Sequence, residues 1–373
     1  MSEGYERTAA LPGRGDGRGG GRGDGAGPGA GRRRGARSGQ QDKVLYPRTE
    51  LNADAAATMV FCVDDTDDLT GDTSTGYVAE RIVEAVGELG GNVQLGITRH
   101  QLLLAEGVPY TSHNSAMAVV TLVPRDAVAV CYQRAATLVE SMSVPGSDPG
   151  LCAAVLPEQL SPADEAALAR LEAFGTRAQT EVCTKEEAYA LAATVPWLRL
   201  SEHGGTGQGV IGALAGCGLR LGGADGRFRG KWDLERILDT TSPVKVGAFC
   251  EAIGKLAGGE VAVVNRRKET LGAEELVQPV CQAKPVLWRG SLAFVVEQNG
   301  ACYVPAEKVD LGKAGSGADW ERVCERFSFD NDSEECADAQ RESCRNCLFR
   351  RWTERGFTCE VTPAAGPAPE TAR

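Results

Sequence analysis

The feature that most constrains this chain is a short apolar run that ends in acidic residues and leads into an amphipathic helix. Residues 59–63 have the length and composition of a buried strand, and 64–68 then supply four carboxylates on one turn. Apolar residues recur at helical spacing over 78–89, after a Ser/Thr cap and before a Gly-Gly exit. The acidic turn should therefore lie at the carboxyl edge of a sheet, where α/β folds bind ligands.

The pattern downstream of this unit predicts further layers. Strands are expected over 93–99 and 117–123, and helices over 126–140 and from 161 onward, which favours an α/β or α+β fold. From 259 the pattern changes to short strands separated by turn residues, so we expect a small β-rich unit over 259–312. Its strands are predicted at 261–264, 285–288, 292–296 and 302–304.

Residues 1–50 are rich in glycine and arginine and have almost nothing apolar to bury, so we expect a disordered tail. It is either a solubilising tail or an arm that contacts RNA phosphates. Residues 1–48 carry ten Lys/Arg and five Asp/Glu, so the remainder carries 30 basic and 46 acidic residues. An acidic body does not attract nucleic acid at long range, which counts against such a substrate unless basic residues cluster locally.

Compartment and cysteine use follow from composition. No stretch approaches the roughly 20 apolar residues of a membrane span, and no apolar signal segment is evident, so we expect a soluble cytoplasmic protein with no membrane partner.

Six cysteines stand singly among apolar or small residues and should be buried thiols. They are Cys62, Cys131, Cys152, Cys183, Cys217 and Cys250.

The acidic turn is the strongest candidate for catalysis. Asp64, Asp65 and Asp67 are expected to bind Mg²⁺, because close carboxylates repel one another unless a cation joins them. Phosphate contacts are expected from the turn and the start of the helix. The residues that supply them are Thr66, Gly71, Ser74 and Thr75. The alternative is a solvated acidic loop with one capping hydroxyl.

Two polar segments are candidates for nucleotide binding. The loop 108–116 contains His113 and Asn114, which suit a ligand, although such a loop is more often an ordinary hydrogen-bonded turn. The segment 202–216 contains G-x-G-x-x-G, but the strand before it is doubtful and no suitable acid follows, so the dinucleotide interpretation is weak. We expect the N–H groups of its turn to face an anion, or the turn to be tight and without a ligand. Its candidate residues are Gly205, Gly207 and Gly209.

The segment 225–232 combines three cations with two aromatic residues. Arg227 and Lys231 are its candidates for phosphate contacts, and Phe228 and Trp232 could stack a base. A solvated charged hairpin is an equal alternative.

The late cysteines form a further group, within a segment 313–373 that we expect to bind metal. Their x7, x2 and x11 spacing suits a zinc site or an iron–sulfur cluster. The four ligands would be Cys336, Cys344, Cys347 and Cys359.

Together, three segments resemble the archaeal tRNA-isoleucine agmatidine synthetases (TiaS). The family's D-D-T-D block, I-P-Y-K-T-R-G-N-like loop and G-R-G-L-I-G-A-like turn correspond, in the same order, to 64–76, 108–115 and 207–213. The resemblance implies a kinase-like catalytic region over 56–258 with ferredoxin-like layers. It departs from the family at Thr73, Ser74 and Gly76 and in the loop's basic residues, and 259–373 does not clearly match the family's tRNA-binding modules.

The resemblance also implies a reaction. ATP phosphorylates the C2 carbonyl oxygen of a cytidine in tRNA, and agmatine or another small amine then displaces the phosphate. By position, Ser74 corresponds to a threonine that the family phosphorylates, with Thr75 beside it. Two other functions stay open: the same ATP chemistry on a small metabolite, and a non-catalytic RNA-binding or metal-sensing protein.

Overall fold

The computed structural model describes residues 51, 55–68, 73–105, 108–111, 113–279 and 283–306 in full, and the backbone alone of 282, 350–353 and 356–359. All of them belong to the unit that spans 40–373. The expectations for the tail, Gly71, Cys336, Cys344 and Cys347 fall outside these residues, as does the Cys359 side chain. None of the helices within the described ranges has the length and apolar character needed to cross a membrane.

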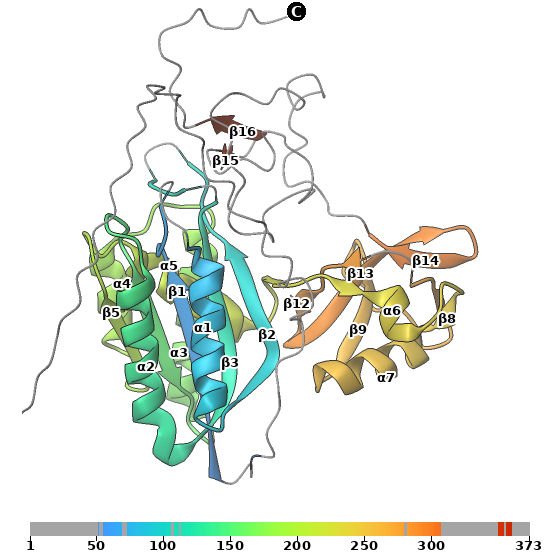
Figure 1. Ribbon diagram of the computed structural model, residues 1–373, viewed down its shortest axis with the longest axis horizontal. Helices are drawn as coiled ribbons and strands as arrows, with labels where there is room; N and C mark the ends of the chain where they lie inside the picture. Colours follow the sequence, from blue (N-terminus) through green and yellow to red (C-terminus); the bar gives the residue numbers. More distant parts are fainter. Residues whose placement is uncertain are drawn as a thin grey trace, which may run out of the picture. The chain divides into compact units, whose positions relative to one another are not determined.

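The first half is built on a four-stranded antiparallel sheet of β-α-β-β-α-β connectivity (Figure 1). Its strand order is β4-β1-β3-β2, which is the ferredoxin-like arrangement. Its elements are β1 (Ala56–Asp64), α1 (Thr75–Glu88), β2 (Asn92–Gln101), β3 (Ser115–Pro124), the 3₁₀ turn η2 (Arg125–Ala127), α2 (Val128–Met142) and β4 (Gly150–Val155).

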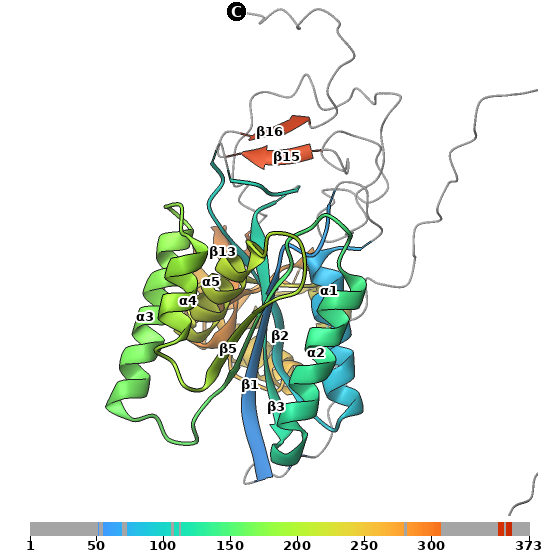
Figure 2. The same cartoon turned by 90° about the vertical axis from the view of Figure 1, so that its left-hand side faces the viewer.

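Helices cover both faces of this sheet (Figure 2). α1 and α2 pack on one face over a core that includes Met59 and Phe61 of β1. The alternate residues of β1, among them Val60 and Cys62, face the other layer. β1 is therefore buried on both sides, as its continuous apolar run predicts. The second layer holds α3 (Pro162–Ala178), α4 (Lys185–Ala192) and α5 (Gly209–Gly222), and β5 (Leu198–Glu202) extends the sheet beside β4.

Local signals in the sequence define the helix starts. Ser74 is the N-cap of α1 and accepts a hydrogen bond from the Tyr77 N–H, and Gly90 follows the helix with a φ of 80°. Ser161 and Asp164 form a reciprocal capping box at α3, with Pro162 at its first turn. These starts agree with the predicted helices.

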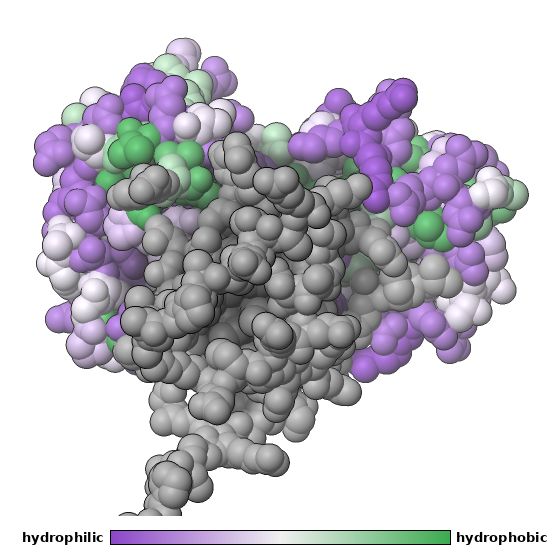
Figure 3. All heavy atoms as spheres, turned by 90° about the horizontal axis from the view of Figure 1, so that it is seen from above, coloured by the Kyte–Doolittle hydropathy of each residue, from purple (hydrophilic) through white to green (hydrophobic). Residues whose placement is uncertain are grey.

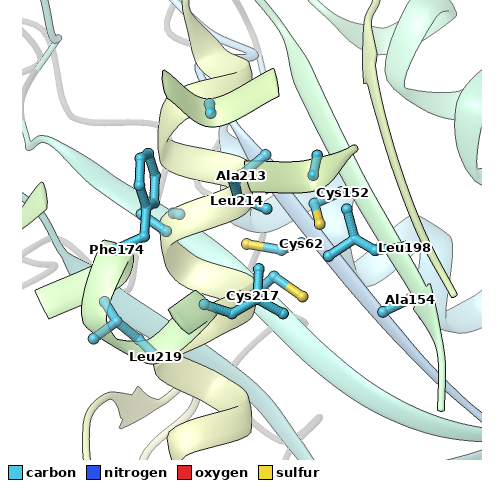
Figure 4. Packing of buried hydrophobic residues seen from close by; sticks show 14 of the residues in the cluster. Cys62, Cys152, Ala154, Phe174, Leu198, Ala213, Leu214, Cys217 and Leu219 are labelled. Carbon is cyan, nitrogen blue, oxygen red and sulfur yellow. The ribbon is translucent and has the colours of Figure 1, made fainter. Parts of the chain in front are cut away.

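α5 lies unusually close to β1 because glycines line its contact face. A side chain at Gly216 would meet the Cys62 thiol and Ala116. Figure 4 shows Cys62, Cys152 and Cys217 among the apolar side chains of this layer. Burial raises the pKa of the Cys62 and Cys152 thiols, so both stay protonated and are unreactive. Five of the six cysteines expected to be buried are buried, and Cys250 is partly exposed.

The second half continues the same sheet through β6, which pairs with β2 on one side and β12 on the other. Its core contains Phe228, Trp232, Phe249 and Phe294. The elements are β6 (Arg227–Phe228), β7 (Trp232–Asp233), α6 (Leu234–Leu238), β8 (Val244–Lys245), α7 (Val246–Ala257), β9 (Val261–Asn265), β10 (Leu276–Val277), β11 (Gln282–Ala283), β12 (Val286–Trp288), β13 (Ser291–Asn299) and β14 (Cys302–Pro305). A separate hairpin pairs β15 (Arg350–Thr353) with β16 (Gly356–Cys359).

The prediction of mixed α/β or α+β layers is confirmed, and each predicted strand of 261–304 is present. The strand that the sequence left doubtful before the glycine-rich turn also exists, as β5. It pairs antiparallel with β4, so the glycine-rich turn does not belong to a parallel dinucleotide-binding unit. The domain boundaries inside 56–373 remain predictions.

Candidate active site

The acidic turn follows β1 where that strand pairs with β4. Asp64 is 8% exposed, and its carboxylate accepts a hydrogen bond from the Asp65 N–H. Burial, followed by the charges of Asp65 and Asp67, raises the pKa of Asp64 well above its usual range. A buried carboxylate with like charges around it is costly unless a proton or a cation neutralises it.

Asp148, which the sequence did not single out, is a fourth carboxylate of this region. It lies in the loop between α2 and β4, and its N–H donates a hydrogen bond to the Asp65 carboxylate. Burial, and then the charges of Asp148 and Asp67, raise the pKa of Asp65 to about 7. The register pairs Asp64 with Gly150, which brings this loop to the end of β1. The four acids therefore come from two segments far apart in the sequence.

Hydroxyl groups connect the acidic turn to α1 and to the loop before β3. Thr66 is fully buried and donates to the Thr75 Oγ1 at 3.2 Å, and Thr75 donates to Asp67 Oδ1 at 2.7 Å. Thr111 donates to Asp67 Oδ2 at 3.4 Å. The site therefore includes the loop 108–111 as well as the turn, and Thr75 contacts a carboxylate.

The glycine-rich loop closes on Asp148. The N–H of Thr206 donates to Asp148 Oδ1, and its hydroxyl donates to Asp148 Oδ2 at 2.9 Å. Lys185 Nζ donates to the Thr206 carbonyl at 2.6 Å. Gly205 and Gly207 have φ values of 54° and 72°, which favour glycine, and a Cβ at Gly205 would overlap the Asp148 carboxylate. The Thr206 N–H thus faces a carboxylate of the protein itself, and the expected contact of the loop with a ligand anion stays a prediction.

The first turn of α5 packs directly on Asp64. A Cβ at Gly212 would overlap the Asp64 carboxylate, and one at Gly209 would overlap the Asp148 carbonyl and the Asp64 backbone. The Gly209 N–H donates to the Asp148 carbonyl at 2.9 Å. Glycine at these positions lets the positive end of the helix dipole approach the acidic turn.

The other candidate residues lie in the loop before β3 and around β6. Asn114 donates to the Leu103 carbonyl at 2.8 Å and accepts from the Leu102 N–H, which fixes the loop to β2. Arg227 belongs to β6, and Lys231 is exposed beside it. His113 directly precedes Asn114 in the loop before β3, and its role in ligand binding stays a prediction. Phe228 and Trp232 are buried in the core, so the idea that they stack a base is wrong.

The acidic turn suits a magnesium ion that is bound by few carboxylates together with the phosphates of a substrate. Nowhere in the fully described ranges do three Asp, Glu, His or Cys side chains converge into a ready-made metal site. Mg²⁺, however, is usually held by one or two carboxylates together with water and substrate phosphates. Asp65 and Asp67, which repel each other and stand partly exposed, fit that mode.

Three solved structures are similar to part of this chain. A complex of TiaS with an isoleucine tRNA and ATP matches at 26% identity and a TM-score of 0.36, over 43% of this chain and 36% of that chain. Apo TiaS, a tRNA agmatidine synthetase, matches at 24% identity, a TM-score of 0.35, and 43% and 35% coverage. A tRNA fluorescent labelling enzyme matches at 24% identity, a TM-score of 0.36, and 43% and 36% coverage.

This chain therefore spans about a third of the length of the solved structures that it matches, and the relationship is a distant structural one. No model of a protein family matches the chain, and no curated protein does either.

The raised pKa of Asp65 predicts how stability depends on pH. Between about pH 4 and 7 the folded protein holds a proton on Asp65 that the unfolded chain has lost, so the free energy of unfolding declines as pH rises across this range and levels off above pH 7. We expect the free energy of unfolding to fall by on the order of 2 kcal/mol more between pH 5 and 8 in the wild type than in Asp65→Asn.

Thermal and denaturant melts at these pH values measure the difference. His100 and His203, whose pKa values are both lowered by burial, act equally in the two proteins. Parallel pH curves for the two proteins would contradict the assignment.

Proposed function

We propose that this chain is an ATP-dependent enzyme that phosphorylates an oxygen of its acceptor and so prepares the bonded carbon for attack by an amine. The observation that carries the proposal is that Asp64, Asp65, Asp67 and Asp148 lie close enough to interact electrostatically, beside a glycine-rich loop and a helix N-terminus. Carboxylates that repel one another in a partly buried site need a compensating cation, and phosphoryl transfer supplies one as a metal–nucleotide complex.

Each element has a proposed role in binding. Asp65 and Asp67 hold the cation, which neutralises the charge of the triphosphate when bound. Asp64 is buried behind them and, when ionised, adds negative field at the cation position. Thr75 and Thr111 hold Asp67 through its two oxygens, so its direction is fixed before the nucleotide arrives.

The glycine-rich loop and the positive end of the α5 dipole are proposed to lie beside the phosphates, with Gly205 and Gly207 permitting the close approach of backbone. The N–H groups of Thr206, Gly207 and Gly209 are bonded within the protein. The reaction then has two steps. The γ-phosphoryl group moves to the acceptor oxygen as its bond to the β–γ bridging oxygen breaks and ADP leaves. The amine then forms a C–N bond as the C–O bond breaks and phosphate leaves.

We propose a cytidine of tRNA as the acceptor and agmatine or another small amine as the nucleophile, on the strength of the three ordered motifs. The strongly acidic first half favours a small metabolite as the competing acceptor.

Incubation with ATP labelled at the γ-phosphate, Mg²⁺, and separate pools of tRNA and small metabolites tests the proposal. Label should enter the tRNA pool when amine is omitted and leave it as phosphate when amine is added. Label in the metabolite pool alone would identify the competing acceptor. No transfer and no ATP turnover in any pool would leave only a binding function.

A further inference from the structure

The second half of the chain carries a different charge from the first. Residues 56–225 contain nine Lys/Arg and 21 Asp/Glu, whereas 226–306 contain eleven Lys/Arg and nine Asp/Glu. A polyanion is repelled by the first half and not by the second. A polyanion should therefore bind at exposed cations of the second half that form no ion pair with a carboxylate.

Lys268 and Arg289 are two such cations, and they share one aromatic ring. The Lys268 Nζ and the Arg289 Cζ each lie 5.2 Å from the centre of the Trp288 ring. Both residues are exposed, and within the described part of the chain neither lies at ion-pair distance from a carboxylate, although the Lys268 charge acts on the nearby Asp225 carboxylate. Nearby cations are neutralised: Arg229 pairs with Glu80 and Arg266 with Glu297.

The backbone gives an independent indication. Lys268 has a φ of 62° and Arg289 a φ of 50°, a left-handed conformation that Gly, Asn or Asp adopts with less strain. Arg289 and Gly290 form the two-residue turn between β12 and β13, where Asn-Gly is the usual choice. A long cationic side chain occupies each of two strained turn positions beside the same ring. Such strain at both positions indicates that the two charges contribute to function.

Apolar association does not account for this region. Large apolar side chains that are exposed among the described residues are few and lie on separate elements: Val130, Leu160, Val182, Leu256 and Leu276. Figure 3 shows that hydrophilic side chains predominate on the face that it presents, where the atoms are not grey. The partner should therefore be recognised by its charge.

We propose that Lys268, Trp288 and Arg289, the Trp288 patch, form a docking surface for the phosphate backbone of an RNA strand. A positive pair held over an aromatic ring suits phosphates, since Arg and Lys neutralise them and the ring keeps the two cations in place. The choice of RNA rests on the proposed function, in which a nucleotide of tRNA is the acceptor. The charge complementarity does not depend on it.

The test is equilibrium binding of fluorescent single-stranded RNA and of bulk tRNA to the full chain, without ATP. The variant is Lys268→Asn with Arg289→Asn, because Asn tolerates the left-handed backbone and the variant should fold at least as stably as the wild type. We expect binding to weaken about 10-fold at 0.1 M salt, and the slope of log K against log salt to fall by about 1.4.

The matched control is Lys245→Asn with Lys255→Asn, which removes two exposed charges that pair with Glu274 and Glu251 in the same half of the chain. It should change RNA affinity less than twofold. The Gly/Arg segment is present in every protein compared, so its contribution cancels.

Equal RNA affinity of the two double variants would overturn the proposal, as would a wild type that binds no RNA. Polyglutamate that binds as tightly as RNA and competes with it would reassign the surface to an acidic protein. Because ATP is absent, a loss of RNA binding in the patch variant supports the surface even if no ATP turnover is ever found, and that second result would count only against the proposed enzyme.

Discussion

Asp65→Asn is expected to reduce Mg²⁺-dependent ATP turnover at least about 100-fold while it raises stability at pH 8. Asn has the shape of Asp and can still accept the hydrogen bond from the Asp148 N–H, so the turn keeps its geometry. It removes one of several like charges in a desolvated site, which should stabilise the fold by about 2 kcal/mol at pH 8. It also removes charge where the nucleotide's cation is proposed to bind.

The opposite signs of the two effects make the result informative. If the Asp65 carboxylate stabilises the fold, its replacement should lower both stability and turnover. If the carboxylate serves catalysis, its replacement should raise stability and lower turnover. Steady-state ATP turnover and chemical denaturation at pH 8 measure the two quantities. Asp126→Asn, an exposed acid in η2, is the control and should change neither. Turnover within threefold of the wild type in Asp65→Asn would remove Asp65 from the mechanism.

Much of the first half could be predicted because its signals are local. The strand, the acidic turn and α1 are contiguous, and burial periodicity, Ser74 and Gly90 define them without reference to the rest of the chain. The resemblance of three motifs placed the acidic turn, the loop before β3 and the glycine-rich turn in one catalytic region. The structure brings Thr111 to Asp67 and Gly212 to Asp64, so all three segments do meet.

Asp148 could not be found in this way. It stands alone in a Pro-Gly-Ser-Asp-Pro-Gly loop that reads as an ordinary turn, and only the pairing of β4 with β1 brings it to Asp65. The wrong prediction that Trp232 stacks a base has a similar cause, because strand pairing also decides where this side chain lies. Charge and aromatic residues alternate around it, but pairing of β6 and β7 with other strands turns the ring into the core, and the aromatic residue held beside two exposed cations is Trp288.

Gly212→Ala is expected to destabilise the protein by about 2 kcal/mol and to abolish cation binding at the acidic turn. The added methyl group would overlap the Asp64 carboxylate and would lie 2.9 Å from Leu102 Cδ1, so α5 must move away from β1 or Asp64 must turn. Either response separates the glycine-rich loop from the carboxylates. Denaturation measures the first effect, and the shift of the melting temperature by Mg²⁺ with ATP measures the second.

Gly87→Ala is the matched control. Gly87 also lies within a helix, α1, but it is exposed and a Cβ there meets nothing within 4 Å. Since Gly is a weaker helix former than Ala, this substitution should stabilise the protein by about 0.5 to 1 kcal/mol and leave cation binding unchanged. The same chemical change thus has opposite effects in two helices, according to what each glycine faces.

A double-mutant cycle shows whether Asp64 is the group that Gly212 accommodates. In Asp64→Ala the carboxylate is absent, so Gly212→Ala should cost at least about 1 kcal/mol less than it does in the wild type. If the cost is the same in both backgrounds, the clash lies with Leu102 instead. If Gly212→Ala stabilises the protein as Gly87→Ala does, α5 does not approach Asp64, and the joint site of acidic turn and glycine-rich loop does not exist.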